Sequence, residues 1–141
     1  VIDRNLKSLF LTGKAITPIF KKQNSGRIIN LGSMSGLTTL NYSSPPYSAA
    51  KAGVHCLTRV LAYELGGFGV CVNAIAPGTT ATERVIAVRT DEERKKIGES
   101  TLIGRIGEVE DMVGWVLFLA APESSYLTGQ TIAVNAGRLM A

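Results

Sequence analysis

The sequence has no long apolar run, only two cysteines and a single histidine, and each shortage narrows its possible functions. No apolar run approaches the ~20 residues of a membrane-spanning helix, so we expect neither a membrane span nor a signal peptide. Cys56 and Cys71 lie within apolar patterns without metal-ligand spacing, and we expect buried free thiols in a reducing cytoplasm. His55 falls off the apolar stripe of its expected helix, so we expect it at the surface or an interface, with no metal site.

Acidic side chains are in the minority, since 15 Lys and Arg residues face 11 Asp and Glu residues and the net charge is +4. A basic balance is typical of proteins that bind nucleic acid. The basic residues are scattered, however, and their densest cluster, residues 94–96, directly follows the acidic residues 91–93. This pattern favours an ordinary solvated helix face, and we expect no nucleic-acid partner.

Apolar periodicity and turn residues predict an α/β chain whose length of 141 residues fits one domain. Short apolar runs that follow turns predict buried parallel strands. Asn24 is expected to stop the first helix, and Pro18 to kink it or end it early. Helices are expected over residues 3–23, 47–65 and 108–121, and strands over 27–32, 70–75 and 131–134.

Tyr47 and Lys51 are four residues apart, and Ser33 lies fourteen residues before Tyr47. On a helix this spacing places Tyr47 and Lys51 on one face. An ammonium beside a phenol stabilises the phenolate, which suits proton transfer. Ser33 falls at the carboxyl end of an expected strand, where open α/β sheets bind ligands. Its hydroxyl can hold a carbonyl or alcohol oxygen there, or it can bond the backbone of its own turn.

Four motifs support a functional interpretation of Tyr47 and Lys51. They are Gly32-Ser33, Tyr47-x-x-x-Lys51, Asn-Ala-Ile-Ala-Pro-Gly at 73–78 and Tyr-Leu-Thr-Gly-Gln-Thr-Ile-Ala-Val-Asn-Ala-Gly at 126–137. Their order and spacing resemble the C-terminal half of the short-chain dehydrogenases/reductases, most closely the 3-oxoacyl-[acyl-carrier-protein] reductase type. The resemblance covers residues 1–141 and implies the C-terminal portion of a single domain with a doubly wound, Rossmann-type parallel sheet.

The family's glycine-rich phosphate loop and its N-terminal nucleotide-binding half are absent from the sequence. We therefore expect residues 1–141 to be a fragment that neither folds nor works alone. An unpaired edge beside the first strand is then an expected site of aggregation.

The resemblance also implies roles for individual residues in hydride transfer. Tyr47 gives a proton to the substrate oxygen, Ser33 holds that oxygen, and Lys51 tunes Tyr47 and holds the nicotinamide ribose. Asn5 stands where the family's catalytic asparagine stabilises a helix kink and a water in the proton relay. Asn73 braces neighbouring backbone.

The loop after the second strand is expected to hold the nicotinamide end of NADP or NAD, with NADP slightly favoured by the resemblance. The contributing residues are Tyr47, Lys51, Ile75, Pro77, Gly78 and Thr82. Thr82 is also a candidate N-cap of the next helix, and the two roles are compatible. Residues 82–100 match the family's mobile substrate-binding segment, and the loop over residues 36–46 is expected to border the active site.

The leading functional hypothesis is reduction of a 3-oxoacyl thioester in the cytoplasm by a homotetramer. A polyol or secondary-alcohol dehydrogenase of the same family is the alternative within the enzymes. A second alternative is a non-catalytic fragment that serves oligomerisation through the helices at 3–23 and 47–65, which pair subunits in the family.

Overall fold

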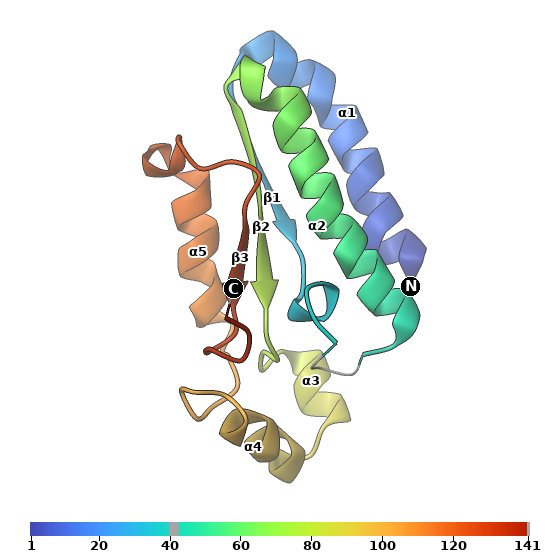
Figure 1. Ribbon diagram of the computed structural model, residues 1–141, viewed down its shortest axis with the longest axis vertical. Helices are drawn as coiled ribbons and strands as arrows, with labels where there is room; N and C mark the ends of the chain where they lie inside the picture. Colours follow the sequence, from blue (N-terminus) through green and yellow to red (C-terminus); the bar gives the residue numbers. More distant parts are fainter. Residues whose placement is uncertain (40–42, 141) are drawn as a thin grey trace.

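The computed structural model describes residues 1–39 and 43–140 and arranges them in three layers around a parallel sheet (Figure 1). Helices α1 and α2 cover one face of the sheet and α5 covers the other, while α3 and α4 lie beyond the ends of the strands. The helices are α1 (Ser8–Gln23), α2 (Pro45–Leu65), α3 (Glu83–Val88), α4 (Asp91–Glu99) and α5 (Glu110–Ala120). The strands are β1 (Gly26–Leu31), β2 (Val70–Pro77) and β3 (Thr131–Val134).

The three predicted strands form a parallel sheet in the order β1-β2-β3. Its register pairs Leu31 of β1 with Ile75 of β2, and Pro77 of β2 with Val134 of β3. The central strand β2 is buried along its whole length except for Pro77, as expected for a strand flanked and covered on both sides. This sheet confirms the predicted α/β class and brings the carboxyl ends of all three strands to one edge.

Helix α2 supplies the main packing surface against the sheet. Leu61, Ala62 and Leu65 pack with Val70 and Val72 in one apolar cluster. Each fully buried aliphatic side chain of this kind stabilises the fold by roughly 1.5–3 kcal/mol. The predicted apolar stripe of the helix therefore faces the core, and it places Tyr47 and Lys51 at the end of α2 nearest the carboxyl edge of the sheet.

The first helix differs from its prediction at its start and at Pro18. A π-helical turn, Asp3–Lys7, precedes α1. Pro18 does not end α1 early, because the helix continues to Gln23 and stops at Asn24, whose φ of 51° is left-handed. Phe20 packs against the core cluster and holds the turns beyond Pro18 in place. The predicted stop at Asn24 is confirmed.

Helix α5 buries much less than its sequence suggests. Its sequence pattern favours a buried side made of Val109, Met112, Val113, Val116, Leu119 and Ala120. Of the described residues of α5, only Leu119 is buried, whereas Val113 is 46% exposed and Val116 is 39% exposed. The helix is apolar on nearly every side, so periodicity cannot select the face that packs. Trp115 and Phe118 pack edge to face with ring centroids 6.4 Å apart.

The two cysteines are both free, as predicted, but only Cys71 is buried. Cys56 is exposed, so the prediction of a second buried thiol is wrong. It lies two residues beyond Val54, which is fully buried against the sheet. Residues two apart on a helix point to opposite sides, and this spacing turns Cys56 outward.

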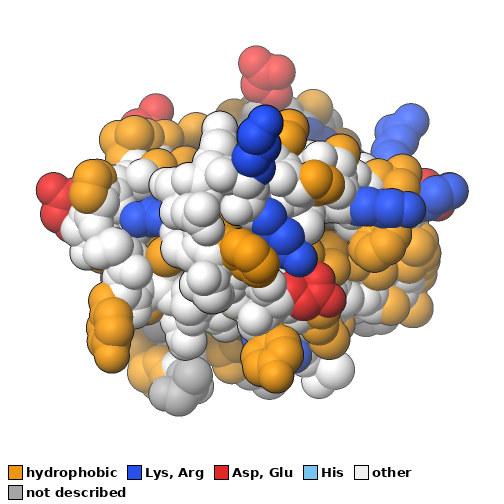
Figure 2. Space-filling model, turned by 90° about the horizontal axis from the view of Figure 1, so that it is seen from above, with side chains coloured by type: hydrophobic (Ala, Val, Ile, Leu, Met, Phe, Trp, Pro, Cys, Tyr) orange, Lys and Arg blue, Asp and Glu red, His pale blue; other side chains and the backbone are white. Residues whose placement is uncertain are grey.

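The basic residues are dispersed, as the sequence predicts. In α4, Arg94 pairs with Asp91 and Lys96 pairs with Glu92. Figure 2 shows the molecule from above, where basic side chains lie beside acidic and hydrophobic ones rather than in one field. Among the described residues, no helix is both long enough and apolar enough to cross a membrane.

Candidate active site

A cleft of about 680 Å³ opens at the carboxyl edge of the sheet. Its floor is the end of β1 and the turn that follows, residues 31–35, and the loop that leaves β2, residues 77–80. Tyr47 and Lys51 reach it from α2. Among the residues predicted for the site, the structure therefore brings Ser33, Tyr47, Lys51, Pro77, Gly78 and Thr82 to one cleft.

Ser33 begins the 3-10 turn Met34–Gly36 with an extended backbone, φ −167° and ψ 150°. Its Oγ accepts a hydrogen bond from the Ser35 amide at 3.2 Å. This is the turn role that the sequence left open, and it uses only an acceptor position of the hydroxyl. The hydroxyl hydrogen is still able to donate to a ligand oxygen in the cleft, so the two roles are compatible.

Gly36 lets this turn approach α2 more closely than any other residue would allow. A Cβ on Gly36 would lie 2.5 Å from the backbone nitrogen of Ala52 and 2.5 Å from the carbonyl carbon of Lys51. Backbone atoms cannot move aside as a flexible side chain can. The missing side chain therefore fixes the distance between the turn that carries Ser33 and the helix that carries Tyr47 and Lys51.

Lys51 connects the two sides of the cleft. Its side chain is buried, and its Nζ donates a hydrogen bond to the carbonyl of Leu31 at 2.7 Å. The same Nζ lies 5.6 Å from the centre of the Tyr47 ring. Burial lowers the pKa of Lys51 below its ordinary value. The arrangement holds a cationic group at the tyrosine while anchoring it to the end of β1.

His55 lies in the interior, so its predicted surface or interface position is wrong. It is 2% exposed, and its Nε2 donates to the Ser33 carbonyl at 3.0 Å, since a carbonyl oxygen only accepts. Its Nδ1 then accepts from the Thr131 hydroxyl at 3.3 Å. Position 55 is four residues beyond Lys51 on the inner face of α2, which the stripe of large apolar residues did not reveal.

The environment of His55 favours the neutral ring. Burial lowers its pKa, the bond to the Ser33 carbonyl opposes this, and the positive charges of Arg59 and Lys51 lower it further. The ring also requires a glycine at position 32, because a Cβ there would lie 2.2 Å from its Cε1. His55 thus braces the backbone of Gly32-Ser33 from beneath the cleft.

The loop after β2 forms the opposite wall. The Gly78 amide donates to the Val134 carbonyl at 2.9 Å, which continues the pairing of β2 with β3. Thr82 caps α3, and its side chain accepts from the Val85 amide at 3.4 Å, as its N-cap interpretation predicts. Ile75 is not among the residues that line the cleft. It is buried in β2, and its carbonyl accepts from the Gly32 amide at 2.8 Å.

Asn5 lies in the π-helical turn, and the structure does not place it among the residues that line the cleft. Its Nδ2 donates to the Val1 carbonyl at 3.0 Å. The turn departs from α-helical geometry where the family resemblance implies a kink. It packs on α2 through Leu6, which occupies the space that a side chain at Gly53 would need.

Asn73 braces the backbone, as predicted. It is almost fully buried, its Nδ2 donates to the Leu127 carbonyl at 2.7 Å, and its Oδ1 accepts from the Gln130 amide at 3.0 Å. Because this segment leads directly into β3, Asn73 holds the start of the last strand against β2.

Two arginines also line the cleft and were missed by the sequence analysis. Arg89 directly follows α3, and Arg138 follows β3. The rule that ligands bind beyond the carboxyl ends of strands would have found Arg138, since it stands three residues after Asn135 at that edge. Among the described residues, no group of three or more acidic, histidine or cysteine side chains is suited to a metal.

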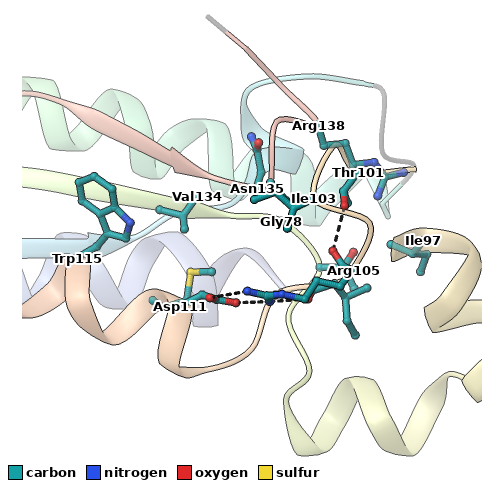
Figure 3. Close-up of a pocket in the computed structure, with 15 residues that line it drawn as sticks. Gly78, Ile97, Thr101, Ile103, Arg105, Asp111, Trp115, Val134, Asn135 and Arg138 are labelled. Carbon is teal, nitrogen blue, oxygen red and sulfur yellow. Dashed lines mark hydrogen bonds and ion pairs between the residues drawn. The ribbon is translucent and has the colours of Figure 1, made fainter. Parts of the chain in front are cut away.

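A second hollow of about 190 Å³ adjoins the cleft between α4, α5 and the end of β3 (Figure 3). Arg105 crosses it and binds both carboxylate oxygens of Asp111, at 2.6 and 2.9 Å. This pair, with a hydrogen bond from the Glu108 amide, lowers the pKa of Asp111 to about 2. Arg105 is therefore engaged by Asp111, and this ion pair lines the hollow.

Comparison with known proteins places this geometry in a family. A family model described as enoyl-(acyl carrier protein) reductase matches residues 1–138. A 3-oxoacyl-[acyl-carrier-protein] reductase of Vibrio cholerae is 40% identical over 140 residues, which cover 99% of this chain and 57% of the relative.

Two solved structures superimpose closely on the chain. A putative gluconate dehydrogenase from Agrobacterium tumefaciens is 34% identical with a TM-score of 0.92, over 100% of this chain and 56% of that one. A 3-oxoacyl-[acyl-carrier protein] reductase with bound NAD from Brucella melitensis is 35% identical with a TM-score of 0.87, over 100% of this chain and 51% of that one.

The chain spans little more than half the length of these relatives. Within that span, the family match, the parallel sheet and the motifs at its carboxyl edge agree. The chain belongs to the short-chain dehydrogenase/reductase family.

Proposed function

We propose that the complete protein carrying this chain is an NAD(P)-dependent oxidoreductase that transfers hydride between nicotinamide and a carbonyl or secondary-alcohol carbon. The observation that carries the proposal is the single cleft shared by Ser33, Tyr47 and Lys51. A hydroxyl, a phenol and a cation at one site are the groups needed to hold an oxygen and to move its proton.

The lining of the cleft suits the nicotinamide end of the cofactor. Leu31, Pro77 and Val109 offer apolar walls to a flat ring, and the threonines of the loop after β2 offer hydroxyls to a carboxamide. Tyr47 and Lys51 would hold the ribose, and Pro77, Gly78 and Thr82 would contact the carboxamide. Ile75 is buried in β2 and would act only by supporting this loop. The bound dinucleotide supplies or accepts the hydride. NADP is slightly favoured over NAD.

In the reductive direction, Tyr47 gives its proton to the substrate oxygen, and Ser33 donates a hydrogen bond that positions this oxygen. Lys51 stabilises the resulting phenolate, since its ammonium is fixed near the ring by Leu31. Asn5 would hold a water that returns a proton to the site from solvent. These assignments make the four residues the proposed catalytic set.

The leading substrate is a 3-oxoacyl thioester, because the Vibrio cholerae and Brucella melitensis relatives are named as 3-oxoacyl-[acyl-carrier-protein] reductases. A polyol, sugar-acid or secondary-alcohol substrate is the second candidate. It is favoured by the structural match to a protein named as a putative gluconate dehydrogenase.

Oxidation of NADPH or NADH by the complete protein, followed by absorbance, tests both candidates. A 3-oxoacyl thioester and a panel of oxidised sugars and polyols serve as substrates, and the thioester is expected to react fastest. Tyr47→Phe is expected to lower kcat by about 10²–10⁴-fold while cofactor affinity stays nearly unchanged. Retained turnover in this variant would exclude Tyr47 as the proton donor.

A non-catalytic role in oligomerisation is the competing hypothesis. Titration with NADPH separates the two, since a protein that binds no nicotinamide cofactor cannot be the proposed enzyme.

We propose a homotetramer for the complete protein, paired through α1 and α2. Light scattering after size-exclusion chromatography measures this state, and a monomer would contradict it.

A further inference from the structure

The charge of the cleft is one-sided. Three of the described residues that line the cleft are cationic, namely Lys51, Arg89 and Arg138. No described residue of this lining is acidic. A cleft lined by charges of one sign concentrates the electric field and attracts ligands of the opposite sign.

The neighbouring cations are engaged by other groups. Lys51 donates to the Leu31 carbonyl, Arg94 is paired with Asp91, and Arg105 is paired with Asp111. By contrast, neither Arg89 nor Arg138 forms an ion pair with any carboxylate side chain among residues 1–39 and 43–140. These two guanidinium groups are therefore available to a ligand.

Hydrogen bonds within its turn hold the backbone at Arg138 in place. Its amide donates to the Asn135 carbonyl at 3.2 Å, and the buried Asn135 side chain bridges to both backbone groups of Leu139, at 3.1 and 3.3 Å. Figure 3 shows the Arg138 side chain extending from this turn on the side away from the Arg105–Asp111 pair. The turn thus presents one guanidinium at the edge of both hollows.

Arg89 reaches the same cleft from α3. Val85 of α3 lines the cleft together with the two residues that flank the helix, Thr82 and Arg89. The exposed Arg89 places its positive charge where the chain leaves α3.

We propose that Arg138, assisted by Arg89, binds an anionic group of the substrate, a carboxylate or a phosphate, while the reacting oxygen lies at Tyr47. The proposal rests on the proposed function and specifies its substrate class as an oxo or hydroxy compound that carries such a group. A guanidinium binds two oxygens of one carboxylate or phosphate in parallel, which fixes the substrate's orientation as well as its affinity.

The test compares matched substrates on the complete protein. Acetoacetate and its ethyl ester differ in a carboxylate, and acetoacetyl thioesters of coenzyme A and of N-acetylcysteamine differ in phosphates. Arg138→Gln is expected to lower kcat/KM for the anionic member of the preferred pair by about 10- to 100-fold, with a much smaller change for the neutral member. Which pair responds identifies the carboxylate or the phosphate as the ligand.

Arg84→Gln is the matched control, because Arg84 lies on α3 with the same charge but does not line the cleft. It is expected to leave the ratio between the paired substrates unchanged. An equal loss for both members of each pair in Arg138→Gln would reveal a purely structural role and overturn the proposal. A rise in KM confined to NADPH would also overturn it, since the anion bound would then be a cofactor phosphate.

Direct binding keeps this proposal separate from the proposed function. If neither pair is turned over, the 3-oxoacyl candidate fails, and calorimetry still tests the anion site with 3-hydroxybutyrate against its methyl ester and with the 3-hydroxybutyryl thioesters of coenzyme A and of N-acetylcysteamine. Tighter binding of the anionic member of either pair, lost in Arg138→Gln, would support the site. Equal binding within both pairs would overturn it.

Discussion

Single buried side chains hold the backbone of this molecule in register, and Asn73 is the clearest case. Its amide satisfies the Leu127 carbonyl and the Gln130 amide, which lie beyond the reach of the β2–β3 ladder. A short side chain at position 73 would remove both of these part-buried hydrogen bonds. The two bonds explain why an amide side chain occupies the middle of an apolar strand.

Asn73→Ala is expected to lower the free energy of unfolding by about 1–3 kcal/mol, because two part-buried hydrogen bonds to the backbone are lost. Urea unfolding of the complete protein measures the change. The control is Gln23→Ala at the exposed end of α1, expected within about 0.5 kcal/mol of the wild type. A loss no larger than that of the control would show that water replaces the Asn73 amide.

His55 gives the molecule a specific dependence of stability on pH. Its pKa in the folded protein lies below the ordinary 6.5, chiefly because the ring is buried. As pH falls below the ordinary pKa of 6.5, His55 takes up a proton in the unfolded chain before it does so in the folded one. Stability from this residue is therefore complete above pH 6.5 and declines as pH falls toward the pKa of the folded state.

His55→Gln is expected to be less stable than the wild type at about pH 8 but to lose less further stability between about pH 8 and pH 5. Unfolding by urea at both values, in both proteins, measures the difference in slope. Other titrating groups are common to the two proteins and cancel in this comparison. Equal slopes would mean that the pKa of His55 is not depressed.

Among the elements, the 3-10 turn that carries Ser33 depends most on a single position. The turn rests directly on the backbone of α2, and the contact is possible only because position 36 has no side chain. The helix places Tyr47 and Lys51, so this contact fixes their distance from Ser33. Small displacements of such groups weaken catalysis strongly, since orientation contributes much of the rate.

Gly36→Ala is expected to lower kcat of the complete protein by at least about tenfold and its stability by about 1–3 kcal/mol, because the turn must move away from α2. Gly66→Ala is the control, since a Cβ at Gly66 meets nothing within 4 Å. That control is expected to retain wild-type kcat and stability. Wild-type kcat in Gly36→Ala would show that Ser33 does not need this contact.

The elements differ in how well the sequence predicts them. Strand β2 and helix α2 have one clear apolar face or a continuous apolar run, and both are predicted within two residues. Helix α3 has only six residues and α4 is polar, so only their caps mark them. Thr90 and Glu93 form a capping box whose sequence pattern is present, but the surrounding charges obscured it.

The residues of the site also differ in how well the sequence predicts them, because some belong to local motifs and others depend on long-range contacts. Ser33, Tyr47 and Lys51 belong to local motifs, and all three line the cleft. The burial of His55 depends on Ser33 and Thr131, which are 22 and 76 residues away in sequence. Contacts of that separation leave no periodic trace, so only the folded structure reveals them.

On the scale of the whole molecule, the described surface is unusually apolar for an isolated domain. Leu31 at the end of β1 is 57% exposed, Phe10 on α1 is 52% exposed and Leu117 on α5 is 65% exposed. These residues lie on three separate elements, and within the described residues β1 pairs with a strand on only one side. Apolar faces and open strand edges both promote association between copies.

The isolated 141-residue chain is therefore expected to self-associate, whereas the complete protein is expected to form the discrete oligomer proposed above. Light scattering at rising protein concentration measures both. A Phe10→Lys, Leu117→Lys double variant separates the two causes, because it adds charge to the helical faces and leaves the β1 edge unchanged. Reduced scattering would assign association to the helices, and unchanged scattering to the strand edge. A stable 15.0 kDa monomer at every concentration would contradict the expectation, since the exposed apolar surface would then have no consequence.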